Sequence, residues 1–175
     1  DKVTVEFTNE LDQPTTVHWH GMRGPELMDG NPRIVDPVPP GGRYTYTFVA
    51  PDAGTYWYHP HVRTNEQLER GLYGAFVVHE PDDPQPDREQ LVLLDDLKLE
   101  GDDFAPFLHP DDRQEAILGR LGNIVLVNGR VAPLRLEGSR GEVVRLRVIA
   151  ASNARTFALE AEGATVRIIG ADSGL

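Results

Sequence analysis

The chain has 175 residues, of which 39% are hydrophobic and 26% are charged, and its formal net charge is −11. This length and this hydrophobic content suffice for a real core in one large domain or two small ones, and they exclude an intrinsically disordered chain. No apolar stretch approaches the roughly 18 residues of a membrane span, so we expect no transmembrane segment. The excess of acidic groups repels phosphate and argues against a nucleic-acid partner.

Apolar and polar residues alternate with a period of two along much of the chain, which is typical of half-buried strands. The alternation is clearest at 3–8 and 43–49. Turn-forming Gly, Pro, Asn and Asp residues separate most of the alternating segments. The sequence therefore predicts an all-β fold of sandwich or barrel modules. Further strands are expected at 15–20, 55–59, 75–79, 90–94, 124–127, 143–149, 157–160 and 165–169, with one helix at 112–121.

A proline-rich segment interrupts this pattern near the middle of the chain. Residues 81–88 contain Pro81, Pro84 and Pro86. Proline cannot donate a hydrogen bond to a β-ladder, so this segment is interpreted as an extended linker. It divides the chain into a first domain at 1–80 and a second domain at 89–175.

Four of the six histidines form two His-x-His motifs, each near the end of an expected strand. The motifs are His18-Trp19-His20 and His59-Pro60-His61. Alternate residues of a strand point to the same face, so each motif presents two imidazoles side by side, roughly 7 Å apart at the backbone. If the two strands pair, all four imidazoles converge. Trp19, Tyr56 and Tyr58 then point to the opposite face and can pack as core.

Neutral imidazole binds copper, zinc, iron and nickel, and a cluster with only nitrogen donors favours copper or zinc. A single His-x-His motif is more often a pair of solvated strand histidines. Two such motifs set among aromatic residues favour a metal site. The chain has no cysteine, so no thiolate ligand is available within these residues.

Other candidate residues are interpreted as structural. His79 ends an expected strand and His109 precedes a proline, so both are expected at the surface. Trp19 and Trp57 are expected in the core rather than at a substrate platform. The arginines that alternate with apolar residues at 143–149 are expected on the solvent face of a half-buried strand.

Several motifs resemble those of the multicopper oxidases, specifically the laccase-like, three-domain bacterial type built from cupredoxin domains. In the first half they are Thr16-Val17-His18-Trp19-His20-Gly21, Met28-Asp29-Gly30, Pro39-Pro40-Gly41-Gly42, Gly54-Thr55-Tyr56-Trp57-Tyr58-His59-Pro60-His61 and Arg70-Gly71-Leu72-Tyr73-Gly74. In the second half, segments 127–129, 141–147 and 171–174 resemble the opening of the family's middle domain.

The resemblance implies cupredoxin-like Greek-key β-sandwich or barrel domains, the first nearly complete and the second truncated. It also implies a trinuclear copper cluster that reduces dioxygen to water. By position, His18 would bind the type 2 copper, and His20, His59 and His61 would bind the type 3 pair. Asp29 matches a family carboxylate that delivers protons during oxygen reduction.

The departures from the family pattern are equally informative. The family's cluster needs eight histidines, and the other four come from the last cupredoxin domain, which also carries the type 1 blue copper. We therefore expect a fragment of a longer enzyme, inactive alone, whose missing C-terminal cupredoxin domain or another chain completes the site. The family resemblance implies a phenol, an aromatic amine or a low-valent metal ion as the reducing substrate, and a periplasmic or extracellular location.

Two alternative hypotheses assign the chain no catalytic activity. One is a copper-binding or storage module of cupredoxin type, in which the four histidines hold one or two ions. The other is a cupredoxin-like interaction domain whose histidines are vestigial and bind no copper.

Overall fold

The computed structural model describes residues 1–82, 84–107, 113–131 and 133–171. The chain divides into two compact units. The first comprises Asp1–Gln67, Gly71–Asp83 and Arg167–Leu175, and the second comprises Leu68–Arg70 and Pro84–Val166. Strands make up most of the regular structure in both units, which confirms the all-β prediction. None of the helices in the described ranges is long and apolar enough to cross a membrane.

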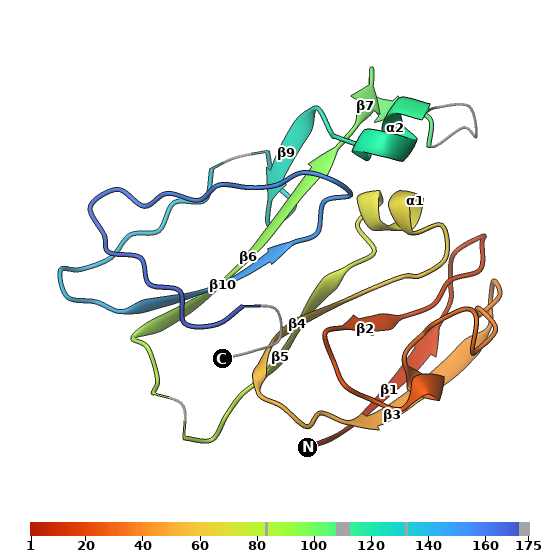
Figure 1. Ribbon diagram of the computed structural model, residues 1–175, viewed down its shortest axis with the longest axis horizontal. Helices are drawn as coiled ribbons and strands as arrows, with labels where there is room; N and C mark the ends of the chain where they lie inside the picture. Colours follow the sequence, from red (N-terminus) through yellow and green to blue (C-terminus); the bar gives the residue numbers. More distant parts are fainter. Residues whose placement is uncertain (83, 108–112, 132, 172–175) are drawn as a thin grey trace. The chain divides into compact units, whose positions relative to one another are not determined.

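The first unit contains a two-stranded and a three-stranded antiparallel sheet (Figure 1). Strands β1 and β3 pair along their whole length, and Val5 lies opposite Tyr46. In the other sheet β4 lies between β2 and β5. The elements of this unit are β1 (Lys2–Thr8), β2 (His18–His20), η1 (Glu26–Met28), β3 (Arg43–Val49), β4 (Gly54–His59) and β5 (Gly74–Val78), and helix α1 (Thr64–Glu69) begins in it.

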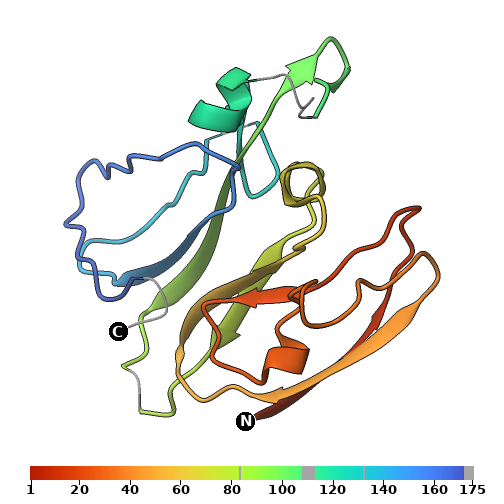
Figure 2. The same cartoon turned by 45° about the vertical axis from the view of Figure 1, so that its right-hand side comes forward.

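The core of the first unit forms where aromatic side chains of these two sheets meet. Trp19 of β2 packs with Tyr46 and Phe48 of β3, and each of the three is at most 7% exposed. Phe76 of β5 joins them, with its ring centroid 5.7 Å from that of Trp19. Because alternate residues of a strand share a face, the period-two pattern delivers these side chains to one side of each sheet. The two sheets face each other across this cluster (Figure 2).

The second unit is built around the long strand β6 (Arg88–Leu97). Strand β10 (Val144–Ala150) pairs with one side of β6 in parallel, and β9 (Ile124–Val127) pairs with the other side antiparallel. The remaining elements are β7 (Leu99–Glu100), β8 (Asp103–Phe104) and α2 (Arg113–Leu118).

A buried ion pair lies in the second unit. The Arg120 side chain is 1% exposed and pairs with Glu69, which is 2% exposed. The same guanidinium donates to the main-chain oxygens of Ala105 at 2.7 Å and Pro106 at 2.8 Å. A buried charge is tolerated when its donors are satisfied in this way, and removal of one partner would leave the other charge uncompensated.

Several sequence-based predictions need correction. The strands expected at 157–160 and 165–169 are wrong, because neither segment forms a ladder with another described segment. Helix α1 was not expected, whereas α2 lies within the predicted helix at 112–121. Residues 108–112, which include His109, lie outside the described residues.

The arginines of β10 also differ from expectation. The side chains of Arg145 and Arg147 are only 13% and 12% exposed, and both pair with Glu89. On the alternate positions, Leu146 is 44% and Val148 is 40% exposed. The prediction that the arginines form the solvent face of this strand is therefore wrong.

Candidate metal centre

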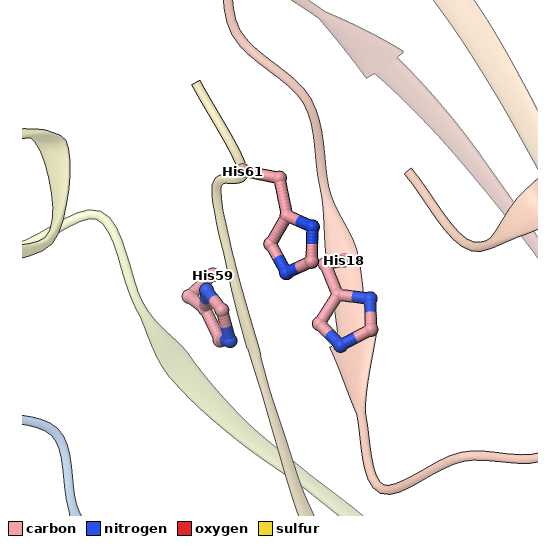
Figure 3. Close-up of side chains that lie close together, drawn as sticks. All are labelled: His18, His59 and His61. Atoms are coloured by element: carbon pink, nitrogen blue, oxygen red, sulfur yellow. The ribbon is translucent and has the colours of Figure 1, made fainter. Parts of the chain in front are cut away.

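Pairing of β2 with β4 brings the two His-x-His motifs together. His18 lies opposite His59 in the antiparallel ladder, and His20 lies opposite Trp57. His61 follows two residues after the end of β4. One nitrogen from each of His18, His59 and His61 lies within 4.8 Å of the others, and Figure 3 shows these three rings turned toward a common locus.

His20 is the fourth histidine of the cluster and contacts His59. Its Nδ1 lies 3.1 Å from the Nε2 of His59, and the two ring centroids are 5.3 Å apart. The ring of His18 lies 5.7 Å from that of His20 and 4.1 Å from that of His61. All four side chains therefore lie around one locus in the first unit.

Main-chain carbonyls set the tautomers of two of these rings. His18 Nδ1 donates to the main-chain oxygen of Asp29 at 2.9 Å, and His59 Nδ1 donates to that of Pro60 at 3.0 Å. A carbonyl only accepts, so the proton of each ring sits on Nδ1 and the lone pair on Nε2. His20 Nδ1 faces this His59 lone pair at 3.1 Å, either as a hydrogen-bond donor or, when the proton of His20 lies on its Nε2, as a second metal ligand. The Nε2 atoms of His18 and His59 are thus prepared to bind a metal ion.

Burial favours the uncharged form of two of the four rings, His59 and His61. His59 is 7% exposed. Its pKa is lowered from 6.5 to about 4, chiefly because burial disfavours the charged ring and also because the other three imidazoles repel a positive charge. Burial likewise lowers the pKa of His61, and His18 contributes to that shift. Neutral imidazole is the form that binds metal, so these two rings are ready at neutral pH.

The facing nitrogens of His20 and His59 fit one shared metal ion. An imidazole nitrogen lies about 2 Å from a bound first-row ion such as zinc. Two such ligands on one ion would be about 2.9 Å apart at a right angle and about 3.3 Å apart at the tetrahedral angle. The observed separation of 3.1 Å falls between these values. The donor set is imidazole only, which suits copper and zinc.

Asp29 lies beside this cluster and contacts His18 through its side chain as well as its backbone. Its Oδ1 lies 3.3 Å from His18 Nδ1, and its side chain is 35% exposed. The next residue, Gly30, has φ of +74°, and a Cβ there would lie 2.1 Å from the main-chain oxygen of Val17. Only glycine allows the loop after η1 to lie this close to β2, which keeps Asp29 in contact with His18.

Two further residues contact the histidines and were not expected to do so. Thr16, which is 5% exposed, accepts a hydrogen bond at 2.9 Å from the backbone N–H of His61. Trp57 stacks on His20 and tilts over His59. The prediction that Trp57 belongs to the core is therefore wrong. Its position two residues before His59 on the same strand was the signal, since residues two apart share a face.

The other expectations about aromatic and histidine side chains have mixed outcomes. Trp19 and Tyr56 are buried as predicted, at 7% and 2% exposed. Tyr58 contacts Trp19 with ring centroids 5.9 Å apart, yet it is 37% exposed. His79 is exposed, as predicted.

Comparison with known proteins agrees with this arrangement. The family description "Multicopper oxidase" matches residues 1–83, which contain all four clustered histidines and Asp29. The chain is 42% identical to a multi-copper oxidase from Pseudomonas thermotolerans with a TM-score of 0.81, covering 90% of this chain and 38% of that one. The chain belongs to the multicopper oxidase family. Membership implies copper as the metal, and the fold is cupredoxin-like.

Named relatives in this family include both oxidases and laccases. The multicopper oxidase MmcO of Mycobacterium tuberculosis is 35% identical over 95% of this chain. Laccase-1 of Cryptococcus neoformans var. neoformans is 34% identical over 74% of it. The chain spans 38% of the length of MmcO and 22% of the length of laccase-1.

Proposed function

We propose that this chain supplies half of the trinuclear copper cluster of a laccase-like oxidase that reduces dioxygen to water. The observation that carries the proposal is the convergence of four imidazoles, with His20 Nδ1 and His59 Nε2 only 3.1 Å apart. The overall reaction consumes four electrons and four protons for each dioxygen. Copper held by these residues would supply the redox chemistry that carries these electrons to dioxygen.

In this proposal His18 holds the type 2 copper, and His20, His59 and His61 hold the type 3 pair. The facing nitrogens of His20 and His59 support a common ion for these two rings. The Nδ1 hydrogen bonds of His18 and His59 leave their Nε2 lone pairs for metal. The low pKa of His59 means that metal binding releases no proton from this ring at neutral pH.

The other half of the cluster comes from polypeptide outside these 175 residues, either a C-terminal cupredoxin domain or another chain. The residues here hold no cysteine, so a type 1 blue copper with a thiolate ligand must lie elsewhere. Electrons from a phenol, an aromatic amine or a low-valent metal ion enter there, and this part alone has no turnover. We place the intact enzyme in the periplasm or outside the cell, as the family resemblance implies.

Asp29 is proposed to bring protons to the oxygen being reduced. Its side chain is 35% exposed and therefore exchanges protons with water, while its Oδ1 lies 3.3 Å from His18 Nδ1. A group that gives up a proton during the reaction must be within reach of the reacting atoms and must be reloaded from solvent. Asp29 meets the second condition by its exposure and approaches the first through its contact with His18.

The test compares His59→Ala with His79→Ala in the full-length protein loaded with copper. His79 is an exposed histidine outside the cluster and serves as the matched control. We expect His59→Ala to lose oxygen uptake with a phenolic reductant while keeping the blue colour, and His79→Ala to keep both. Oxygen uptake that survives in His59→Ala would refute the assignment. An unmutated protein that holds copper but consumes no oxygen would instead be a storage module.

A further inference from the structure

Trp57 lies against the two histidines that face each other. In the β2–β4 ladder it is the cross-strand partner of His20. Its ring stacks on that of His20 with centroids 4.9 Å apart and an interplanar angle of 29°. It also lies 4.3 Å from the ring of His59 at 33°. A single indole thus covers one face of each of the two rings.

This contact opposes rotation of the two imidazoles and adds to the hydrogen bond between His59 Nδ1 and the Pro60 carbonyl. An imidazole turns about its Cβ–Cγ bond, and that torsion is broad and poorly defined by intrinsic preference. The separation of 3.1 Å between His20 Nδ1 and His59 Nε2 exists only while both rings keep their present orientation. A flat indole packed against one face of each imidazole opposes this rotation, and such stacking contributes beyond simple burial.

We propose that Trp57 is a positioning residue for the metal ion shared by His20 and His59, an inference that rests on the proposed copper site. Trp57 is partly exposed and lies outside the buried core cluster of Trp19, Tyr46 and Phe48. Its principal ring contacts are with the two histidines. Loss of the indole should therefore act on the ion that this pair holds, more than on the core of the unit.

The experiment measures copper retention in the full-length protein for Trp57→Leu, Trp57→Phe and the control Tyr58→Leu. Tyr58 is the next residue of β4 and points to the opposite face, where its ring contacts Trp19. Copper ions per molecule are counted by native mass spectrometry during titration with a copper(I) chelator, and far-ultraviolet circular dichroism confirms folding. If Trp57→Leu does not fold, Trp57→Val replaces it, because a β-branched side chain suits a strand.

We expect Trp57→Leu to release one copper ion at about tenfold lower chelator concentration, the scale of effect seen for residues that orient metal ligands. Trp57→Phe keeps an aromatic face and should restore most of the retention. Tyr58→Leu should match the unmutated protein. Unchanged retention in folded Trp57→Leu, or equal loss of every ion, would overturn the positioning role. The His59→Ala variant keeps the two proposals apart, since full copper retention there would reject the copper site itself.

Discussion

Substitution of Gly30 by alanine should lower the stability of the protein and also break the hydrogen bond that orients the His18 ring. The new Cβ would lie 2.1 Å from the main-chain oxygen of Val17, whereas carbon and oxygen ordinarily approach to about 3.3 Å. The loop must therefore move by about 1 Å. The hydrogen bond of 2.9 Å from His18 Nδ1 to the Asp29 carbonyl would stretch to roughly 4 Å, which breaks it.

The expected cost combines two effects of similar size. A non-glycine residue in the left-handed region costs about 1–2 kcal/mol. Overpacking against a strand backbone adds about 1–3 kcal/mol. The free energy of unfolding should thus fall by about 2–5 kcal/mol. Gly41 has φ of +73° with no atom within 4 Å of an added Cβ, so Gly41→Ala should show the first effect alone.

Urea unfolding of the copper-free protein measures both variants, and competition with a chelator measures their copper affinity. The loss of unfolding free energy in Gly30→Ala should exceed that in Gly41→Ala by about 1–3 kcal/mol. Only Gly30→Ala should bind copper more weakly, by about tenfold or more. Equal losses in the two variants, or undiminished copper affinity in Gly30→Ala, would show that the contact between Gly30 and β2 does not hold His18 in place.

Two further substitutions test residues next to the histidines. Thr16→Val removes the acceptor for the His61 N–H, so it should lower the free energy of unfolding by about 1–3 kcal/mol and weaken copper retention. Thr16→Ser keeps the hydroxyl and should preserve both the stability and the copper retention. Identical urea midpoints for the two variants would contradict this. Asp29→Asn keeps the main-chain carbonyl that accepts a hydrogen bond from His18, so copper should stay bound. Oxygen reduction should slow about 100-fold because the proton donor is lost. If an oxygen electrode records the same rate as for the unmutated protein, Asp29 does not deliver protons.

The strands of the first unit follow closely from local sequence. Residues 3–8 and 43–49 alternate strictly, and the structure places β1 at Lys2–Thr8 and β3 at Arg43–Val49. Their alternating apolar positions are buried or half-buried against the core cluster, so pattern and packing agree. The segments at 157–160 and 165–169 alternate as well, yet they form no ladder with another described segment. A strand needs a hydrogen-bonded neighbour, and the pattern of a segment does not reveal whether one exists.

The identity of the clustered histidines could be read from the sequence because residues two apart on a strand share a face whatever the partner strand is. That rule places His18 beside His20 and groups Trp57 with His59. Which rings meet, however, depends on the register of β2 against β4, where a shift of one residue would turn one motif away. The separation of 3.1 Å between His20 and His59 and the stacking of Trp57 on His20 follow from that register. The approach of Gly30 to Val17 depends instead on how the loop after η1 packs against the segment before β2. Only the tertiary structure determines these contacts. Each contact joins atoms that are distant in sequence, and no local preference of the chain sets the distance between them.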